Sequence, residues 1–260
     1  MKLYLKYILL LLKSQLQYKA SFILTVFTQF ITPITAFAGI YLLFERFSNI
    51  KGWGVYEVLL CFAVIGACHA MATCFARGFD SFPGMIKNAE FDRVLVRPRN
   101  TILQILGSKF DIKRIGHMME ATAILIVAIR GINLEWSIVK VITLINMIIG
   151  GTCILSGVYM LQATMAFWTV EAIEVANILT DGVREYASYP LDIYPKWIKN
   201  FFTFIIPFGC VNYLPLLSLI GRRSGSEAFY MLLPLLGTLF IIPCIFIWSF
   251  GVRHYKSTGS

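Results

Sequence analysis

Long apolar runs separated by short polar connections make up most of this chain. Residues 20–44, 58–76, 141–170 and 228–252 contain no Asp, Glu, Lys or Arg. A helix needs about 20 consecutive apolar residues to cross the hydrocarbon core of a bilayer. The runs lack the alternation of apolar and polar residues that marks the strands of a membrane barrel. The pattern therefore predicts an all-α membrane protein.

The apolar runs and the charges between them predict six membrane-spanning helices. Five follow directly from the pattern, and we place them at residues 20–44, 57–76, 115–133, 138–166 and 228–251. The third is the weakest, because Glu120 and His117 lie near its inner end. In the fourth, Gly150, Gly151 and Gly157 allow neighbouring helices to approach closely.

Two interpretations remain open for the fifth span. Hydropathy alone selects residues 200–221, which would leave the charged residues before them in the cytoplasm. The alternative is residues 167–188, with residues 189–222 forming an external segment that dips into the bilayer and returns. Pro207 and Pro215 favour this alternative, because a broken, re-entrant pair of helices tolerates prolines where protein covers the backbone.

The alternative fifth span contains charged residues that form a candidate intramembrane polar feature. Its members are Glu171, Glu174, Asp181 and Arg184. Charged residues inside a span are tolerated when they face a bundle interior and pair with one another. Asp181, Arg184 and Glu185 fall on one helix face, so Arg184 can neutralise an acid beside it. Internal structural ion pairs would explain the same residues equally well.

Composition and charge agree with a membrane protein and predict its orientation. Hydrophobic residues make up 58% of the 260 residues and charged residues only 14%, too few for the polar shell of a soluble domain. The net charge is +9, and basic residues concentrate in residues 1–19, 77–114 and 253–256. Cytoplasmic loops carry the excess of Lys and Arg, so these segments and both termini are predicted to be cytoplasmic, in a cell membrane protein. This rule explains the positive charge without nucleic-acid binding.

The N-terminal residues 1–19 contain four evenly spread lysines and no small-residue cleavage site after a short apolar core. We interpret them as an amphipathic helix that lies in the cytoplasmic interface of the membrane. The alternative is a plain, uncleaved start to the first span.

The sequence lacks the motifs of common catalytic sites. It contains no G-x-x-x-x-G-K-[S/T] loop for ATP phosphates, no H-E-x-x-H and no G-x-S-x-G. His69, His117 and His254 are scattered, and the six cysteines form no C-x-x-C pair. We therefore expect no catalytic residue, no metal site and no cofactor bound by this chain.

The polar loop at residues 77–114 carries the sharpest local signal. Pro83 suits the first turn of a short helix, and Pro98 would end it, because proline disfavours α geometry in the residue before it. One side of this helix would be apolar, formed by Phe82, Met85, Ile86 and Phe91. A short amphipathic helix in a basic loop suits a groove on another protein. An ordinary loop helix lying on the membrane surface is the alternative.

Two groups of motifs carry a family resemblance. In the polar loop, Glu90-Phe91-Asp92 leads to Arg97-Pro98, with Gln104 shortly after. Further along, Tyr189-Pro190 leads to Tyr194-Pro195, then to Ile206-Pro207-Phe208 and Val211-Asn212-Tyr213-Leu214-Pro215. With these motifs the chain resembles, over essentially its full length, the ABC-2-type ABC transporter permeases, of a subgroup formerly described as a domain of unknown function. Glycine usually precedes the Glu-Phe-Asp triplet in that family, whereas this chain has Ala89.

The resemblance implies a single transmembrane domain over residues 1–260 that acts as half of a transporter. A second permease subunit, identical or related, would face it across a pore among the membrane lipids. Two copies of a separate ABC ATPase subunit would bind ATP and magnesium. Each would dock on the loop at residues 77–114, which would hold a coupling helix. We expect the ATPase-coupling residues to be Met85, Ile86, Glu90, Phe91, Asp92, Arg93 and Arg97.

The leading functional hypothesis is export of a lipophilic or amphiphilic compound, such as a drug, a lipid or a peptide. ATP hydrolysis on the partner would drive it, and Phe91→Ala is expected to uncouple that hydrolysis while the protein stays folded. An ion- or proton-coupled secondary carrier is the alternative hypothesis, based on the charges predicted inside the fifth span.

Overall fold

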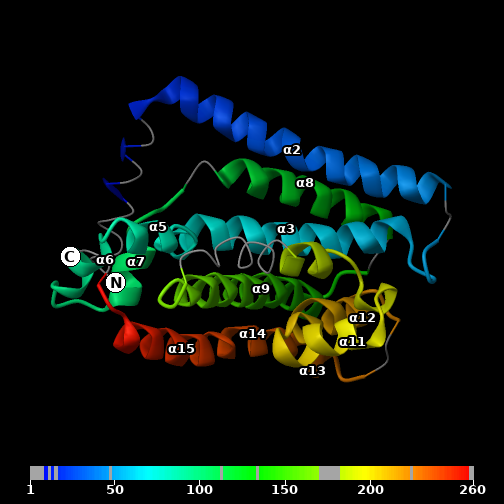
Figure 1. Ribbon diagram of the computed structural model, residues 1–260. Coiled ribbons are helices and arrows are strands. Elements are labelled where there is room, and N and C mark those ends of the chain that lie inside the picture. Colours follow the sequence, from blue (N-terminus) through cyan, green and yellow to red (C-terminus); the bar gives the residue numbers. More distant parts are fainter. Residues whose placement is uncertain are drawn as a thin grey trace.

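The structure is a computed structural model, and it is described here for residues 9–10, 13–14, 17–46, 49–111, 114–132, 135–169, 182–222 and 225–257. Long helices run side by side along one axis (Figure 1). They are α2 (Lys19–Arg46), α3 (Val55–Phe75), α8 (Ile115–Ile132), α9 (Ile138–Met165) and a continuous run of α13 (Glu227–Leu232), η5 (Leu233–Leu235), α14 (Leu236–Leu239) and α15 (Ile241–His254). All regular elements of this described part are helical.

Helix α3 lies at the centre of the bundle because it is apolar on all sides. Such a helix has no polar face to present to water and is buried in the interior. Most of its side chains are buried, from Val58 to Cys74. It packs against α8 on one side and α9 on the other, with α2 outside α8 and α15 outside α9 (Figure 1).

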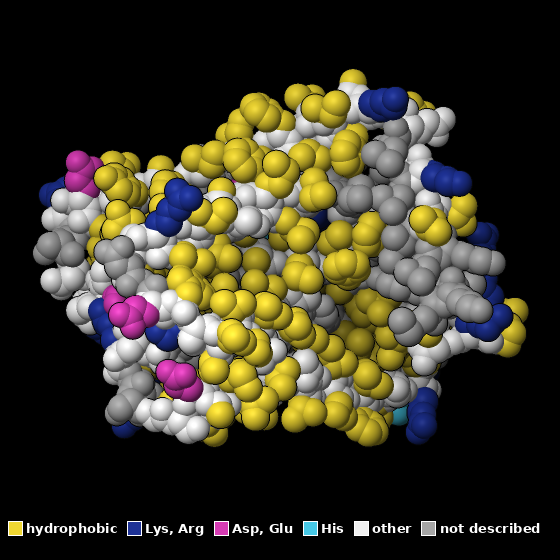
Figure 2. All heavy atoms as spheres, turned by 180° about the vertical axis from the view of Figure 1, so that it is seen from behind, with side chains coloured by type: hydrophobic (Ala, Val, Ile, Leu, Met, Phe, Trp, Pro, Cys, Tyr) yellow, Lys and Arg dark blue, Asp and Glu magenta, His cyan; other side chains and the backbone are white. Residues whose placement is uncertain are grey.

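Four helices of the described part are long and apolar enough to cross a membrane: α3, α8, α9 and the run at Glu227–His254. Hydrophobic side chains cover much of the face seen in Figure 2, and charged side chains lie mostly toward its two ends. The four helices coincide with the second, third, fourth and sixth spans that the sequence predicts. Helix α2 occupies the position of the first predicted span, with a shorter apolar stretch at Lys19–Ile31. Most of residues 1–19, where an interfacial helix is predicted, lies outside the described residues.

The region of the disputed fifth span contains a sharply bent helix pair. The segments Lys196–Ile205 and Gly209–Leu219 meet at 89° and comprise α11 (Lys196–Asn200), η3 (Phe201–Ile205), η4 (Gly209–Tyr213) and α12 (Leu214–Leu219). Pro207 lies at the bend. The bend shows that residues 200–221 do not form one straight span. Residues 170–181, the middle of the alternative span, lie outside the described residues.

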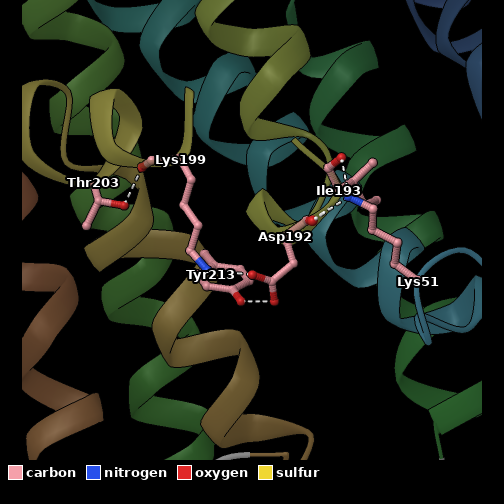
Figure 3. A network of polar contacts seen from close by, with 6 residues as sticks. All are labelled: Lys51, Asp192, Ile193, Lys199, Thr203 and Tyr213. Atoms are coloured by element: carbon pink, nitrogen blue, oxygen red, sulfur yellow. Dashed lines mark hydrogen bonds and ion pairs between the residues drawn. The ribbon is translucent and has the colours of Figure 1, made fainter. Parts of the chain in front are cut away.

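A polar network joins the bent segment to the connection between α2 and α3 (Figure 3). Asp192, in the short helix η2 (Leu191–Ile193), accepts hydrogen bonds from Lys199 Nζ (2.5 Å) and from the Tyr213 hydroxyl. Lys51 Nζ donates to the carbonyl oxygens of Asp192 (3.2 Å) and Ile193 (3.1 Å). The segment at residues 189–199 therefore lies at the same end of the bundle as Lys51.

A second set of contacts fastens the same end of the bundle. Arg222 Nη2 lies 2.5 Å from both Glu57 Oε2 and the Gly52 carbonyl oxygen. The Arg222 guanidinium also lies over the ring of Trp53, 4.6 Å from its centre. Glu57 in turn accepts a hydrogen bond from the backbone N–H of Gly54 and so caps the start of α3. The residues after α12 are thus bonded to the first turn of α3.

The charge of Asp192 contributes to the stability of this network. Partial burial raises the pKa of its carboxyl group, but the hydrogen bonds from Lys199 and Tyr213 and the charges of Lys199 and Lys51 outweigh it, so the pKa lies below its ordinary value. A carboxylate with a lowered pKa stabilises the fold above the pKa of the unfolded chain, and this stabilisation is lost as pH falls through the folded-state pKa.

Asp192→Asn is expected to lower the Tm at neutral pH, because it removes the charged acceptor of both hydrogen bonds. The difference from the wild type should shrink as pH falls below about 4, because the aspartate is protonated first in the unfolded chain and, at lower pH, in the folded protein as well. Thermal unfolding followed by tryptophan fluorescence in detergent measures both effects. Glu227→Gln is the matched control, since Glu227 is an exposed acid in the first turn of α13. An equal Tm for Asp192→Asn and wild type at neutral pH would contradict the assignment.

Candidate functional site

Four short helices between α3 and α8 form the end of the bundle opposite the network of Figure 3. They are α4 (Arg77–Asp80), α5 (Phe82–Lys87), α6 (Phe91–Leu95) and α7 (Thr101–Leu106). The C-terminal end of α15 lies beside them (Figure 1). Their amphipathic sequences place apolar side chains against the bundle and charged ones outside. We call this set of helices the short-helix end.

An aromatic cluster anchors the short-helix end to the long helices. It consists of Phe79, Phe82, Phe91, Phe167, Trp248 and Tyr255, whose contacting ring pairs have centroids 4.9 to 5.8 Å apart. Phe79, Phe82 and Phe91 are almost completely buried. Trp248 Nε1 also donates a hydrogen bond to the Thr101 hydroxyl, 3.2 Å away. Phe79 of α4 and Phe82 of α5 thereby pack on α15, and Phe91 of α6 packs on Tyr255 just after it.

Helix α5 ends at a tight backbone turn centred on Ala89. The N–H of Glu90 donates to the carbonyl of Met85 (2.8 Å), and the N–H of Ala89 donates to that of Ile86 (3.0 Å). This pair of bonds is the Schellman motif, which needs a left-handed residue and usually has glycine there. Ala89 occupies it with φ of 53°. The need for a left-handed backbone explains why a glycine suits this position. The turn at Ala89 divides the single helix predicted from the sequence into α5 and α6.

Ala89→Gly is expected to stabilise the protein. An L-residue in the left-handed region costs about 1–2 kcal/mol, and glycine avoids this cost. Glycine also loses more conformational freedom on folding, which offsets about 0.5–1 kcal/mol of that gain. The net gain of about 0.5–1 kcal/mol should raise the Tm by about 1–3 °C. Thermal unfolding of the two proteins side by side tests this. A lower Tm for the glycine variant would show that Ala89 is not strained.

Asp92 of α6 is bonded to the segment that follows α15. Its two carboxylate oxygens accept hydrogen bonds from the Tyr255 hydroxyl (3.0 Å) and from the Ser257 hydroxyl (2.6 Å). The Tyr255 ring also packs edge-on against Phe91, with centroids 5.0 Å apart. Two consecutive residues of α6 are therefore held by the C-terminal end of the last long helix.

Hydrogen bonds from Gln104 hold the turn between α6 and α7 in place. This side chain is buried, and its Nε2 donates to the carbonyl oxygens of Val94 and Arg99, both at 3.1 Å. Asn100 caps the start of α7, because its Oδ1 accepts from the backbone N–H of Ile102 (2.9 Å). A cavity of about 210 Å³ lies beside the turn, lined by Met85, Glu90, Arg93, Val94, Arg97, Gln104 and Ser108.

The structure divides the predicted coupling residues into three groups. Met85, Glu90, Arg93 and Arg97 line the cavity, and all but Met85 are exposed. Ile86 and Phe91 are instead buried inside the chain, with exposed fractions of 2% and 0%. The apolar side of the predicted helix thus packs on its own bundle, and a role of these two side chains in ATPase coupling stays a prediction. Asp92 is partly buried and engaged by the C-terminal segment.

The intramembrane polar feature is described only in part. Glu171, Glu174 and Asp181 lie outside the described residues, whereas Arg184 is described and half-buried. A further acid, Glu120 of α8, is 4% exposed, and its Oε1 has no hydrogen-bond partner among the described residues. The sequence places Glu120 near the end of a predicted span, but periodicity alone does not indicate that it faces inward.

Comparison with known families covers almost the whole chain. The sequence model of the ABC-2 family transporter proteins matches residues 30–259. The chain belongs to this family. The match includes every long helix except the first turns of α2, and it includes the whole short-helix end. No individual curated protein matches the chain.

Family membership gives the ABC-2 chain its general role. It is an ABC transporter permease, a membrane subunit of a kind that in general carries no catalytic activity of its own. Its apolar helices agree with a membrane location. An ABC transporter assembly also includes an ATPase, so this family member is expected to work with an ATPase partner.

Proposed function

We propose that this permease is half of an exporter that moves a lipophilic or amphiphilic compound out of the cell. Two such subunits, identical or related, would form the membrane part, and two ATPase subunits would drive it. The observation that carries the proposal is the short-helix end, where exposed charged residues project from helices packed on the last long helix. The sequence contains no P-loop, so the ATP-binding loop would come from the partner.

The proposed topology has six spans in the plasma membrane. The short-helix end and both termini lie on its cytoplasmic side. The basic residues of this end support the orientation. Phe167 packs on Tyr255 at the short-helix end, whereas the Ala187 carbonyl accepts a hydrogen bond from Asn212 Nδ2 (3.2 Å) toward the opposite end. These positions support residues 167–188 as the fifth span and residues 189–222 as an external, re-entrant segment.

The packing offers a route by which the ATPase could move the membrane part. A partner that shifts α6 would pull on Phe91 and Asp92, and these residues contact Tyr255 beyond α15. Coupling requires that two states of the permease bind the ATPase and the substrate with different affinities. The contacts between α6 and the last span are suited to biasing such a pair of states.

An apolar cavity supports the proposed substrate class. It measures about 580 Å³ and lies among α9, η3, α14 and α15. Its lining is apolar except for Gln162 and includes aromatic rings such as Phe201, Phe204 and Phe240. Pockets of this size and chemistry bind mainly apolar molecules with few polar contacts. A compound that partitions into the bilayer could reach it from the side of the bundle.

Reconstitution with its ATPase tests the proposed function. The tagged permease would be purified from membranes, the co-purifying ATPase identified by mass spectrometry, and the complex placed in liposomes with a fluorescent lipid. We expect ATP-dependent movement of the lipid to the leaflet opposite the ATPase, and none with a P-loop variant of the ATPase. Movement driven by a proton gradient without ATP would instead support a secondary carrier and overturn the proposal.

A further inference from the structure

The turn between α6 and α7 presents one apolar side chain at the polar end of the molecule. This turn, residues 95–99, is here called the tip. Val96 is 85% exposed, the highest fraction among the large hydrophobic side chains of the described part. Phe204 and Ile138 are each 80% exposed, but Phe204 lies on the bent segment that we propose to dip into the bilayer, and Ile138 is the first residue of α9 within a predicted span. Val96 instead lies in a turn whose sequence neighbours Arg97 and Arg99 are charged and exposed, so we expect water to contact it.

The backbone of the tip is fixed by hydrogen bonds. Gln104 joins the carbonyls at its two ends, as described above. The N–H of Val96 donates to the backbone carbonyl oxygen of Asp92 (3.2 Å), and the N–H of Arg99 donates to that of Arg97 (2.7 Å). Pro98 restricts φ at the centre of the turn. A surface that is ordered before binding loses less conformational entropy when a partner docks.

Three arginines lie within three residues of the exposed valine in the sequence. Arg93, Arg97 and Arg99 are exposed, and the ion pairs of the described part involve other basic residues. A guanidinium presents a planar fork that matches the two oxygens of a carboxylate. Glu90 is the acid among the residues that line the adjoining cavity, so the charge there is net positive. The partner that fits this surface carries negative charge.

We propose that the tip inserts Val96 into a small apolar socket on the ATPase subunit, and that Asp or Glu residues around the socket pair with the three arginines. This inference rests on the proposed function and adds the chemistry of the partner's surface. A buried apolar anchor within a polar rim is the usual arrangement of a binding hot spot. The fixed backbone and the single apolar anchor favour a shaped protein surface as the partner. Acidic lipid headgroups would bind the arginines without an ordered backbone or an apolar anchor.

Site-specific photocrosslinking tests the socket. The variant Val96→p-benzoylphenylalanine, irradiated in native membranes, is expected to crosslink to the ATPase, at a peptide whose neighbouring residues include Asp or Glu. Val127→p-benzoylphenylalanine is the matched control, since Val127 is exposed on α8 within a predicted span. A crosslink from position 96 to lipid, or to an ATPase peptide without nearby acids, would overturn the inference.

Charge and apolar variants give an independent measurement on the purified complex. Val96→Asp is expected to reduce the ATPase recovered with the permease by about tenfold, the effect of losing one hot-spot side chain. Arg93→Gln and Arg97→Gln should each lower the amount of ATPase recovered with the permease. They should also make this amount less sensitive to salt concentration. Arg130→Gln, an exposed arginine at the end of α8, is the control and should change nothing.

The two proposals fail in different ways. If an ATPase is recovered in equal amounts with wild type and Val96→Asp, the socket is wrong and the proposed function stands. If no ATPase is recovered with the wild-type permease under any condition that keeps it folded, the proposed function itself fails. Each variant is expected to keep the wild-type Tm, because all four substituted positions are exposed, namely Arg93, Val96, Arg97 and Arg130.

Discussion

Replacing Phe91 by alanine is expected to unfold the short-helix end and to abolish stimulation of the ATPase. The Phe91 ring is completely buried against Phe82, Phe167 and Tyr255. Truncating a buried phenylalanine costs about 3–5 kcal/mol, because it removes apolar burial and leaves a cavity. The effect on the ATPase is thus expected together with a clear loss of stability, measured as a lower Tm of the purified permease.

Two controls separate this role from direct contact with a partner. Phe91→Leu keeps most of the volume and should cost less than about 1.5 kcal/mol, with partial stimulation retained. Phe246→Ala removes a ring that is 71% exposed on α15 and should leave the Tm unchanged. If Phe91→Ala lost stimulation at an unchanged Tm, Phe91 would be a contact residue and the buried packing would be incorrect.

Gly150→Ala is expected to disrupt the contact between α9 and the helical run at Glu227–His254. A Cβ at position 150 would lie 2.1 Å from the carbonyl oxygen of Pro234, and one at Gly237 would lie 2.4 Å from that of Gly150. Both obstacles are backbone atoms, so no side-chain rotation relieves them. Overpacking of this kind costs about 3 kcal/mol and should lower the Tm by about 6–10 °C.

The same substitution at Gly39 is the matched control. Gly39 lies in α2, and a Cβ there would meet nothing within 4 Å. Alanine is a better helix former than glycine by about 0.5–1 kcal/mol, so Gly39→Ala should keep or raise the Tm. Size-exclusion chromatography of both variants would show whether Gly150→Ala alone loses the folded permease. Equal behaviour of the two would mean that the spans do not approach at Gly150.

The positions of the long helices could be predicted well from the sequence. The span predicted at residues 138–166 corresponds to Ile138–Met165, and that at 115–133 corresponds to Ile115–Ile132. Charged or polar residues interrupt the apolar runs, and these interruptions mark helix ends. Close approach at Gly150 was also indicated, because a small residue inside a span leaves room for a neighbour. These features depend on local sequence, which is why they were accessible.

The candidate site was predicted only in part, since its geometry depends on contacts distant in sequence. The pattern around Phe91 showed that one side of α6 is apolar, but not that Phe167 and Tyr255 cover it. The break at Ala89 arises from a left-handed backbone that alanine seldom adopts. The hydrogen bonds from Gln104 and Tyr255 connect separate segments, so no short motif specifies them.

ATP hydrolysis by the separate and the combined subunits tests the central claim most directly. The claim is that this ABC-2 permease takes its energy from a separate ATPase bound at the short-helix end. The purified permease alone should hydrolyse no ATP, the reconstituted complex should, and Val96→Asp should reduce the permease-dependent part at an unchanged Tm. Hydrolysis by the permease alone, or a stimulation that is the same in wild type and in the Phe91→Ala and Val96→Asp variants, would contradict the account.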